Sequence, residues 1–117
     1  MTWDDDRLTQ LQFDAVSDTD LSAATVALEL TDPAGTVTTH TASWTGAVTT
    51  QTRWSTEQRA QVTRWHRTAL TSEQFGGTAV TVGAGRVLLT TGEWVGQWLV
   101  AIGGSVVPSA EFTITVP

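Results

Sequence analysis

The stretch that decides the fold is residues 91–102, which read TGEWVGQWLVAI. Apolar residues and one glycine occupy every second position along it, at Trp94, Gly96, Trp98, Val100 and Ile102. A period of two predicts a β-strand with one face in the core. The intervening residues are of mixed polarity, so we expect the opposite face to be partly covered as well. Two indoles on one face carry a large apolar area, and a second sheet is needed to bury it.

Outward from this strand, β-prone segments alternate with turn signals such as Asp32-Pro33-Ala34-Gly35. The predicted strands cover residues 8–16, 25–31, 36–44, 47–54, 78–82, 86–90, 106–107 and 110–116. We expect residues 78–82 and 86–90 to form a hairpin or one bulged strand, and residues 106–107 to lie at an edge before Pro108. Short strands at this spacing predict one all-β domain over residues 1–117. Its expected architecture is an antiparallel β-sandwich of immunoglobulin-like type without the Cys…Trp…Cys signature.

Residues 55–70 depart from this pattern and predict one short helical insertion. Ser55 and Gln58 have the spacing of a capping box, in which a hydroxyl begins a helix and a glutamine follows three residues later. Apolar residues then recur at helical spacing, at Val62, Trp65 and Ala69. A strand remains the alternative, because Val62, Arg64 and His66 also alternate with their neighbours. We treat residues 53–75 as an inserted segment that carries Arg and Trp.

The composition limits both covalent chemistry and compartment. The chain contains no Cys, so disulfides and thiolate metal sites are excluded. Its first ten residues lack the basic and apolar regions of a signal peptide, and no apolar run approaches the ~18 residues of a membrane span. We therefore expect a product made in the cytoplasm that does not associate with a membrane.

The charge is acidic and unevenly distributed. The net charge is −6. Residues 1–52 hold eight acids and one Arg (−7), residues 53–67 hold four Arg and one Glu (+3), and residues 68–117 hold three Glu and one Arg (−2). An acidic molecule repels phosphate, so nucleic acid is not an expected partner. Opposite charges on separate segments favour association between neighbouring copies instead.

No constellation of residues predicts catalysis. The two histidines, His40 and His66, lie far apart in sequence and have no second His at ligand spacing. The serines do not form a nucleophile elbow, the glycines do not form a dinucleotide fingerprint, and the acids cluster in expected loops. We predict no catalytic, cofactor-binding or metal-binding residues, and no cofactor. The expected protein is not an enzyme.

The six tryptophans are the most unusual feature of the composition. Four of them occupy strand positions and are expected to fill the core, namely Trp44, Trp54, Trp94 and Trp98. Trp3 and Trp65 are expected to be exposed. Together with the basic segment they make an interface candidate, because Trp and Arg dominate binding hot spots. The candidate interface residues are Trp3, Arg53, Arg59, Arg64, Trp65 and Arg67.

Several short sequence segments together resemble those of a known group of domains. They are Leu11-Gln12-Phe13, the sequence DLSAATV at 20–26, Asp32-Pro33-Ala34-Gly35, TGEWVGQW at 91–98 and FTITV at 112–116. The chain is similar in these segments to immunoglobulin-like domains of phage virion proteins, in particular the N-terminal domain of phage baseplate upper proteins. Residues 53–75 have no counterpart in that pattern.

The resemblance implies a non-enzymatic structural or assembly protein of a phage particle. Such a protein could decorate the capsid, lie at the head–tail junction, or belong to the tail or baseplate. Its expected partners are other virion proteins or copies of itself, and its expected location is the virion. The alternative is a β-sandwich module that binds carbohydrate or a host surface through exposed indoles.

Overall fold

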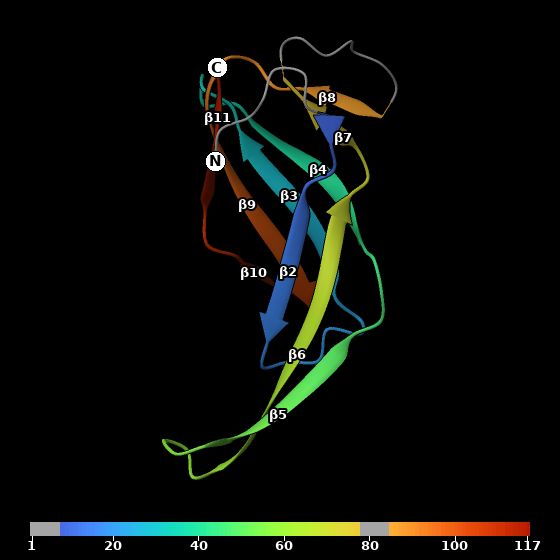
Figure 1. Ribbon diagram of the computed structural model, residues 1–117, viewed down its shortest axis with the longest axis vertical. Helices are drawn as coiled ribbons and strands as arrows, with labels where there is room; N and C mark the ends of the chain where they lie inside the picture. Colours follow the sequence, from blue (N-terminus) through green and yellow to red (C-terminus); the bar gives the residue numbers. More distant parts are fainter. Residues whose placement is uncertain (1–7, 78–84) are drawn as a thin grey trace.

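The structure, a computed structural model, describes residues 8–77 and 85–117 (Figure 1). Within these ranges all regular secondary structure is β-strand. The strands are β1 (Leu8–Thr9), β2 (Gln12–Ser17), β3 (Thr25–Thr31), β4 (Val37–Trp44), β5 (Thr49–Ser55), β6 (Ala60–Thr71), β7 (Gln74–Gly76), β8 (Arg86–Leu88), β9 (Gly92–Ile102), β10 (Ser105–Pro108) and β11 (Phe112–Val116).

The first layer is built around β9, which contains the alternating stretch with Trp94 and Trp98. One edge of β9 pairs antiparallel with β3 from Thr25↔Ala101 to Thr31↔Val95. Its other edge is shared, because β10 pairs with the C-terminal half of β9 and β11 with the N-terminal half. Strand β4 continues this layer beyond β3. Strand β10 therefore lies at an edge, as predicted from Pro108.

The second layer is built around β6, which pairs with β2 on one edge and with β4 and β5 on the other. Strand β4 belongs to both layers. Its first part, Val37–Thr41, pairs with β3, and its last part, Ala42–Trp44, pairs with β6. One strand thus closes one side of the fold. The prediction of an all-β antiparallel sandwich is confirmed.

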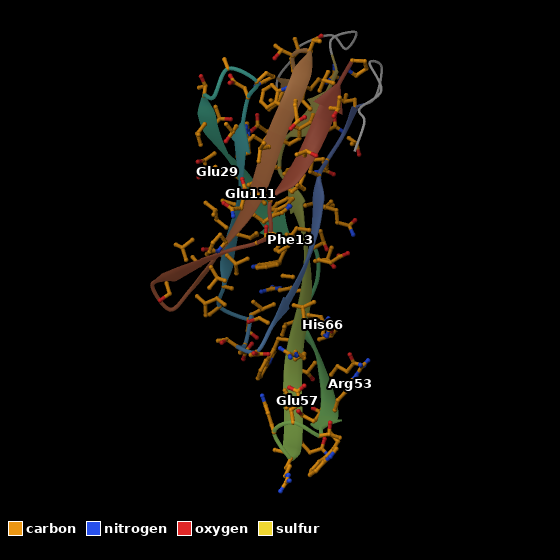
Figure 2. All side chains as sticks on the ribbon, turned by 90° about the vertical axis from the view of Figure 1, so that its left-hand side faces the viewer. Phe13, Glu29, Arg53, Glu57, His66 and Glu111 are labelled. Carbon is orange, nitrogen blue, oxygen red and sulfur yellow. The ribbon has the colours of Figure 1, made fainter. Side chains whose placement is uncertain are left out.

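The core lies between the two layers and contains the alternating face of β9. Trp98 and Trp94 are 3% and 7% exposed. The Phe13 ring of β2 stacks on the Trp98 indole across the core, with ring centroids 5.2 Å apart and planes 10° apart. Figure 2 shows Phe13 directed from β2 between the layers. On the other face of β9, Glu93 is exposed, and the residues of mixed polarity that follow it are half-buried, as predicted, namely Val95, Gln97, Leu99 and Ala101.

Two glycines in β9 are required by close packing. Gly92 has φ +131°, and a Cβ there would lie 2.6 Å from the Pro33 ring. A Cβ on Gly96 would lie 2.3 Å from the ring of Phe112, its cross-strand partner in β11. The absence of a side chain at position 96 therefore lets the Phe112 ring cross β9.

The helix predicted over residues 55–70 is wrong. The Gln58 amide does donate to the Ser55 hydroxyl, at 3.3 Å, as a capping box requires. The bond closes the loop of a hairpin, however, because Arg59 adopts φ +51° and β6 begins at the next residue. Seven cross-strand pairs between β5 and β6 then satisfy the backbone. This pairing with a Thr-rich neighbour overrides the helical spacing of Val62, Trp65 and Ala69.

Most other strand predictions are confirmed, and the predicted strand over residues 25–31 coincides with β3. The turn before β4 also forms as expected: the Gly35 amide donates to the Asp32 carbonyl at 2.9 Å, and Gly35 has φ +93°. The hairpin expected from residues 78–82 and 86–90 lies partly outside the described residues. Its described part, β8, pairs in parallel with β7 in a small sheet that also contains β1.

Candidate interaction site

The β5–β6 hairpin extends beyond the sandwich and contains most of the predicted interface residues (Figure 1). Its strands pair from Thr49↔His66 to Ser55↔Ala60. Strand β2 ends at Ser17, opposite Trp65, so the part of the hairpin beyond Trp65 has no neighbour from β2. The described part of the molecule is elongated, with extents of 53 × 26 × 25 Å, and the hairpin forms one end of its long axis.

The two faces of the hairpin follow from strand alternation. Cross-strand partners point to the same side of an antiparallel pair, so Trp54 shares a face with Gln61, Thr63 and Trp65. The same row continues along β6 to Ala69, which is fully buried. Trp54 therefore extends the core-facing row of the second layer past the point where the body covers it.

The exposure of two tryptophans is opposite to the prediction. Trp54, expected in the core, is 59% exposed. Trp65, expected on the surface, is half-buried and packs against the hydrophobic core. Both side chains lie on the core-facing side, and only the length of the opposing layer separates them. Trp44 is half-buried against the core, and Trp3 lies outside the described residues.

Arg67 is held by the body of the fold. Its guanidinium donates to the carbonyls of Gly46 and Leu21, each at 3.0 Å, and to the Ser22 carbonyl at 3.2 Å. The guanidinium carbon also lies 5.1 Å from the centre of a Trp44 ring. These contacts tie β6 to the loops before β3 and β5, so Arg67 has a structural role that its sequence did not reveal.

The loop that Arg67 contacts is itself ordered by an acid. Asp20 accepts hydrogen bonds from the Ser22 hydroxyl at 2.6 Å and from the Ser22 amide at 2.9 Å. The hydroxyl, the amide and the charge of Arg67 lower the pKa of the Asp20 carboxyl below its ordinary value. A carboxylate thus remains charged beside Leu21.

The three other arginines of the hairpin differ in whether their side chains are already paired. Arg64 forms an ion pair with Asp18, in which both side chains are more than half exposed. Such exposed pairs contribute ~0–1 kcal/mol and exchange readily for other partners. The side chains of Arg53 and Arg59 have no hydrogen bond or ion pair with any described residue. Arg53 therefore adjoins Trp54 in β5 but points to the opposite face, and Arg59 lies in the loop of the same hairpin.

The outer face of the hairpin forms a polar depression of about 620 Å³. Its lining residues include Arg53, Trp54, Arg64 and His66. Figure 2 shows Arg53 and His66 on the same side of the hairpin. The buried Nε2 atom of His66 has no hydrogen-bond partner among the described residues. This face offers the cationic groups of Arg53 and Arg64 to an acidic surface.

His40, the other histidine, is buried in the body. One ring nitrogen is 2.9 Å from the Thr38 hydroxyl and the other is 3.2 Å from a Glu73 carboxylate oxygen. Its ring packs edge-on against Phe75. In the described ranges, no three His, Cys, Asp or Glu residues are grouped so that they could hold a metal ion. Residues 8–77 and 85–117 also include no helix with the length and apolar character needed to cross a membrane.

A second hollow, which the sequence did not indicate, lies on the open side of the sandwich. It has a volume of about 330 Å³ and is lined mainly by apolar side chains from the edge strand β2, from β9 and from the edge strand β10. Alternation did predict that Phe13 and Val100 face inward. It could not show that the two edges stand far enough apart to leave a space.

Comparison with known proteins finds no relative of this chain. No family model matches the chain, and neither a curated protein nor a solved structure is significantly similar to it.

Proposed function

We propose that this chain is a non-enzymatic structural or assembly protein of a phage particle, and that it binds a neighbouring subunit through the β5–β6 hairpin. The observation that carries the proposal is the exposed Trp54 at the end of a projecting ribbon, beside Arg53 and Arg59, which have no ion pair among the described residues. The resemblance to virion immunoglobulin-like domains supplies the kind of assembly.

The hairpin has the features of a binding element. Every residue of β5 except the half-buried Ser55 is exposed, although the strand is seven residues long and fully paired on one edge. Burial of a Trp side chain removes about 150–250 Å² of surface from water, which is a large fraction of what a hot spot contributes. An isolated hairpin gains little stability in water, so this one depends on its continuity with β6 inside the sandwich. The body thus anchors the ribbon while its end remains free to bind.

Charge separation supports a protein partner. Outside residues 53–67, the described chain holds eight acids and one Arg, for a net −7. Residues 53–67 hold +3. Complementary patches accelerate and orient association between subunits. Carbohydrate binding by indole stacking is the competing function, but it has one exposed indole, Trp54, among the described residues.

Competitive incorporation into particles tests the proposal. Cells that produce the particle would express two tagged copies, wild type and Trp54→Glu, and purified particles would be analysed by quantitative mass spectrometry. We expect the chain in a fixed, repeated number of copies, with the Trp54→Glu form incorporated at least ~10-fold less. The control is Val37→Glu, which also replaces an exposed apolar residue, 54% exposed, but lies in β4. Absence of the chain from particles, or incorporation of the Trp54→Glu form equal to that of wild type, would contradict the proposal.

A further inference from the structure

We infer that the hairpin end of one copy is received by the open side of a second copy, with the Trp54 indole in the apolar hollow between β2 and β10. This inference rests on the proposed function and identifies the partner surface. It follows from four observations: the open side of the sandwich, the size and polarity of the hollow, the charges around both regions, and the distance of Trp54 from the hollow of its own chain.

The hollow exists because the sandwich is closed on one side only. Strand β4 joins the two layers, whereas on the opposite side the layers end at different strands, β10 and β2. Val107 pairs with the buried Val100, so its side chain faces inward, yet it is 54% exposed. The space between these edges is therefore incompletely filled by the chain itself.

The size and polarity of the hollow suit an indole. Its volume of about 330 Å³ lies at the lower end of the ~300–1,000 Å³ that is typical of ligand pockets. Phe13, Leu21, Val100, Ile102 and Val107 provide most of its apolar lining. Phe13 is already stacked on Trp98, so an entering ring would contact an aromatic side chain held in a defined orientation.

The charges around the two regions are complementary. The lining residues of the hollow include Asp14 and no cation. Asp20, whose carboxyl has a lowered pKa, immediately precedes the lining residue Leu21. Beside Trp54, Arg53 and Arg59 are without an ion pair among the described residues. An indole that entered the hollow would bring these cations close to the acids.

Trp54 cannot occupy the hollow of its own chain. The hollow lies beside β2, which ends at Ser17 opposite Trp65. Trp54 lies opposite Gln61, four residues further along the ribbon, or about 13 Å at ~3.3 Å per residue. The hairpin extends away from the body at that point (Figure 1). The occupant must therefore come from a second molecule, and each molecule carries one donor and one acceptor surface.

Two variants that disable different halves of the contact test this arrangement. Trp54→Glu removes the donor, and Val107→Arg places a long cation in the hollow, where it would obstruct the indole and repel the basic hairpin. Val106→Arg is the matched control for the acceptor, because Val106 is 59% exposed on the same strand but does not line the hollow. Val37→Glu is the control for the donor. Thermal melts would establish that each variant is folded.

Sedimentation velocity and native mass spectrometry would measure the association. We expect wild type and both controls to associate with increasing concentration and more weakly at high salt. Trp54→Glu and Val107→Arg should each weaken self-association at least ~10-fold. An equimolar mixture of these two variants should form 1:1 heterodimers, because Val107→Arg still carries an intact donor and Trp54→Glu an intact acceptor.

The failures of this inference and of the proposed function are distinguishable. A wild-type chain that is monomeric at all concentrations, normal association of Val107→Arg, or a mixture that stays monomeric would overturn the inference. None of these results bears on whether particles select against the Trp54→Glu chain. If particles do so while the mixture stays monomeric, the hairpin binds a different virion protein.

Discussion

Trp98 and Trp54 occupy similar positions in the alternating pattern and have opposite environments. Each lies on the core-facing side of its strand, yet Trp98 is 3% exposed and Trp54 is 59% exposed. Trp98 is covered by Phe13 from the opposing layer. At the position of Trp54 the opposing layer has ended. Alternation therefore indicates which side a residue faces, whereas the extent of the neighbouring sheet decides whether anything covers it.

The arginines show the same difference between the body and the end of the hairpin. Arg67, at the base, donates to three backbone carbonyls and contacts Trp44, while Arg53 and Arg59, near the end, have no such partners among the described residues. The same residue type thus stabilises the fold in one place and remains available for binding in another. The comparison predicts that substitutions in the body change stability and that those in the hairpin change association.

The largest effect is expected for Trp98→Ala. Removal of a buried indole leaves a cavity and takes away the ring on which Phe13 stacks, so the free energy of unfolding should fall by ~3–5 kcal/mol. Guanidinium denaturation followed by circular dichroism would measure it. A loss below ~1 kcal/mol would show that the two layers do not pack on Trp98.

A smaller loss is expected for Arg67→Ala. Hydrogen bonds from a charged donor contribute ~1.5–3 kcal/mol, and this substitution leaves three carbonyls without that donor. Arg67→Lys should recover only part of the loss, because an ammonium cannot reproduce the planar donor geometry. Arg53→Ala, analysed in the same denaturation series, should change stability by less than ~0.5 kcal/mol. Equal losses for the two positions would remove the distinction between base and end.

The smallest effect on stability is expected for Trp54→Ala, within ~0.5 kcal/mol of wild type, because its side chain is already mostly in water. The same substitution should weaken self-association strongly, which sedimentation velocity would detect. A clear fall in the melting temperature without any change in association would assign Trp54 to the core of this molecule, as the alternation alone suggested.

Much of the body could be predicted from local patterns. The strand over residues 25–31, the Asp32–Gly35 turn and the apolar face of β9 all follow from alternation and turn chemistry. These features depend on residues close in sequence. The same is true of the Ser55–Gln58 bond, which forms as the capping pattern required. That bond did not distinguish the start of a helix from the loop of a hairpin.

The candidate site was predicted in part. The charge of residues 53–67 indicates a candidate site, and this segment forms the projecting hairpin together with the rest of β5 and β6. The roles of the individual residues in this segment could not be predicted. Arg67 donates to carbonyls about 45 residues away in sequence, and Arg64 pairs with Asp18 across a similar separation. The exchange of Trp54 and Trp65 between surface and core has the same cause. Neighbours that are distant in sequence decide which side chains are already paired or covered, and no local pattern contains them.

The sequence by itself determined the pleat of each strand, the sites of the turns, the absence of thiol chemistry and the separation of charge. These are consequences of side-chain size, backbone preference and composition, which act within a few residues. The tertiary structure alone decided that the β5–β6 hairpin continues past the end of β2 and that the sandwich is open between β2 and β10. Both depend on where strands distant in sequence end when they pair, and this sets which apolar side chains remain uncovered.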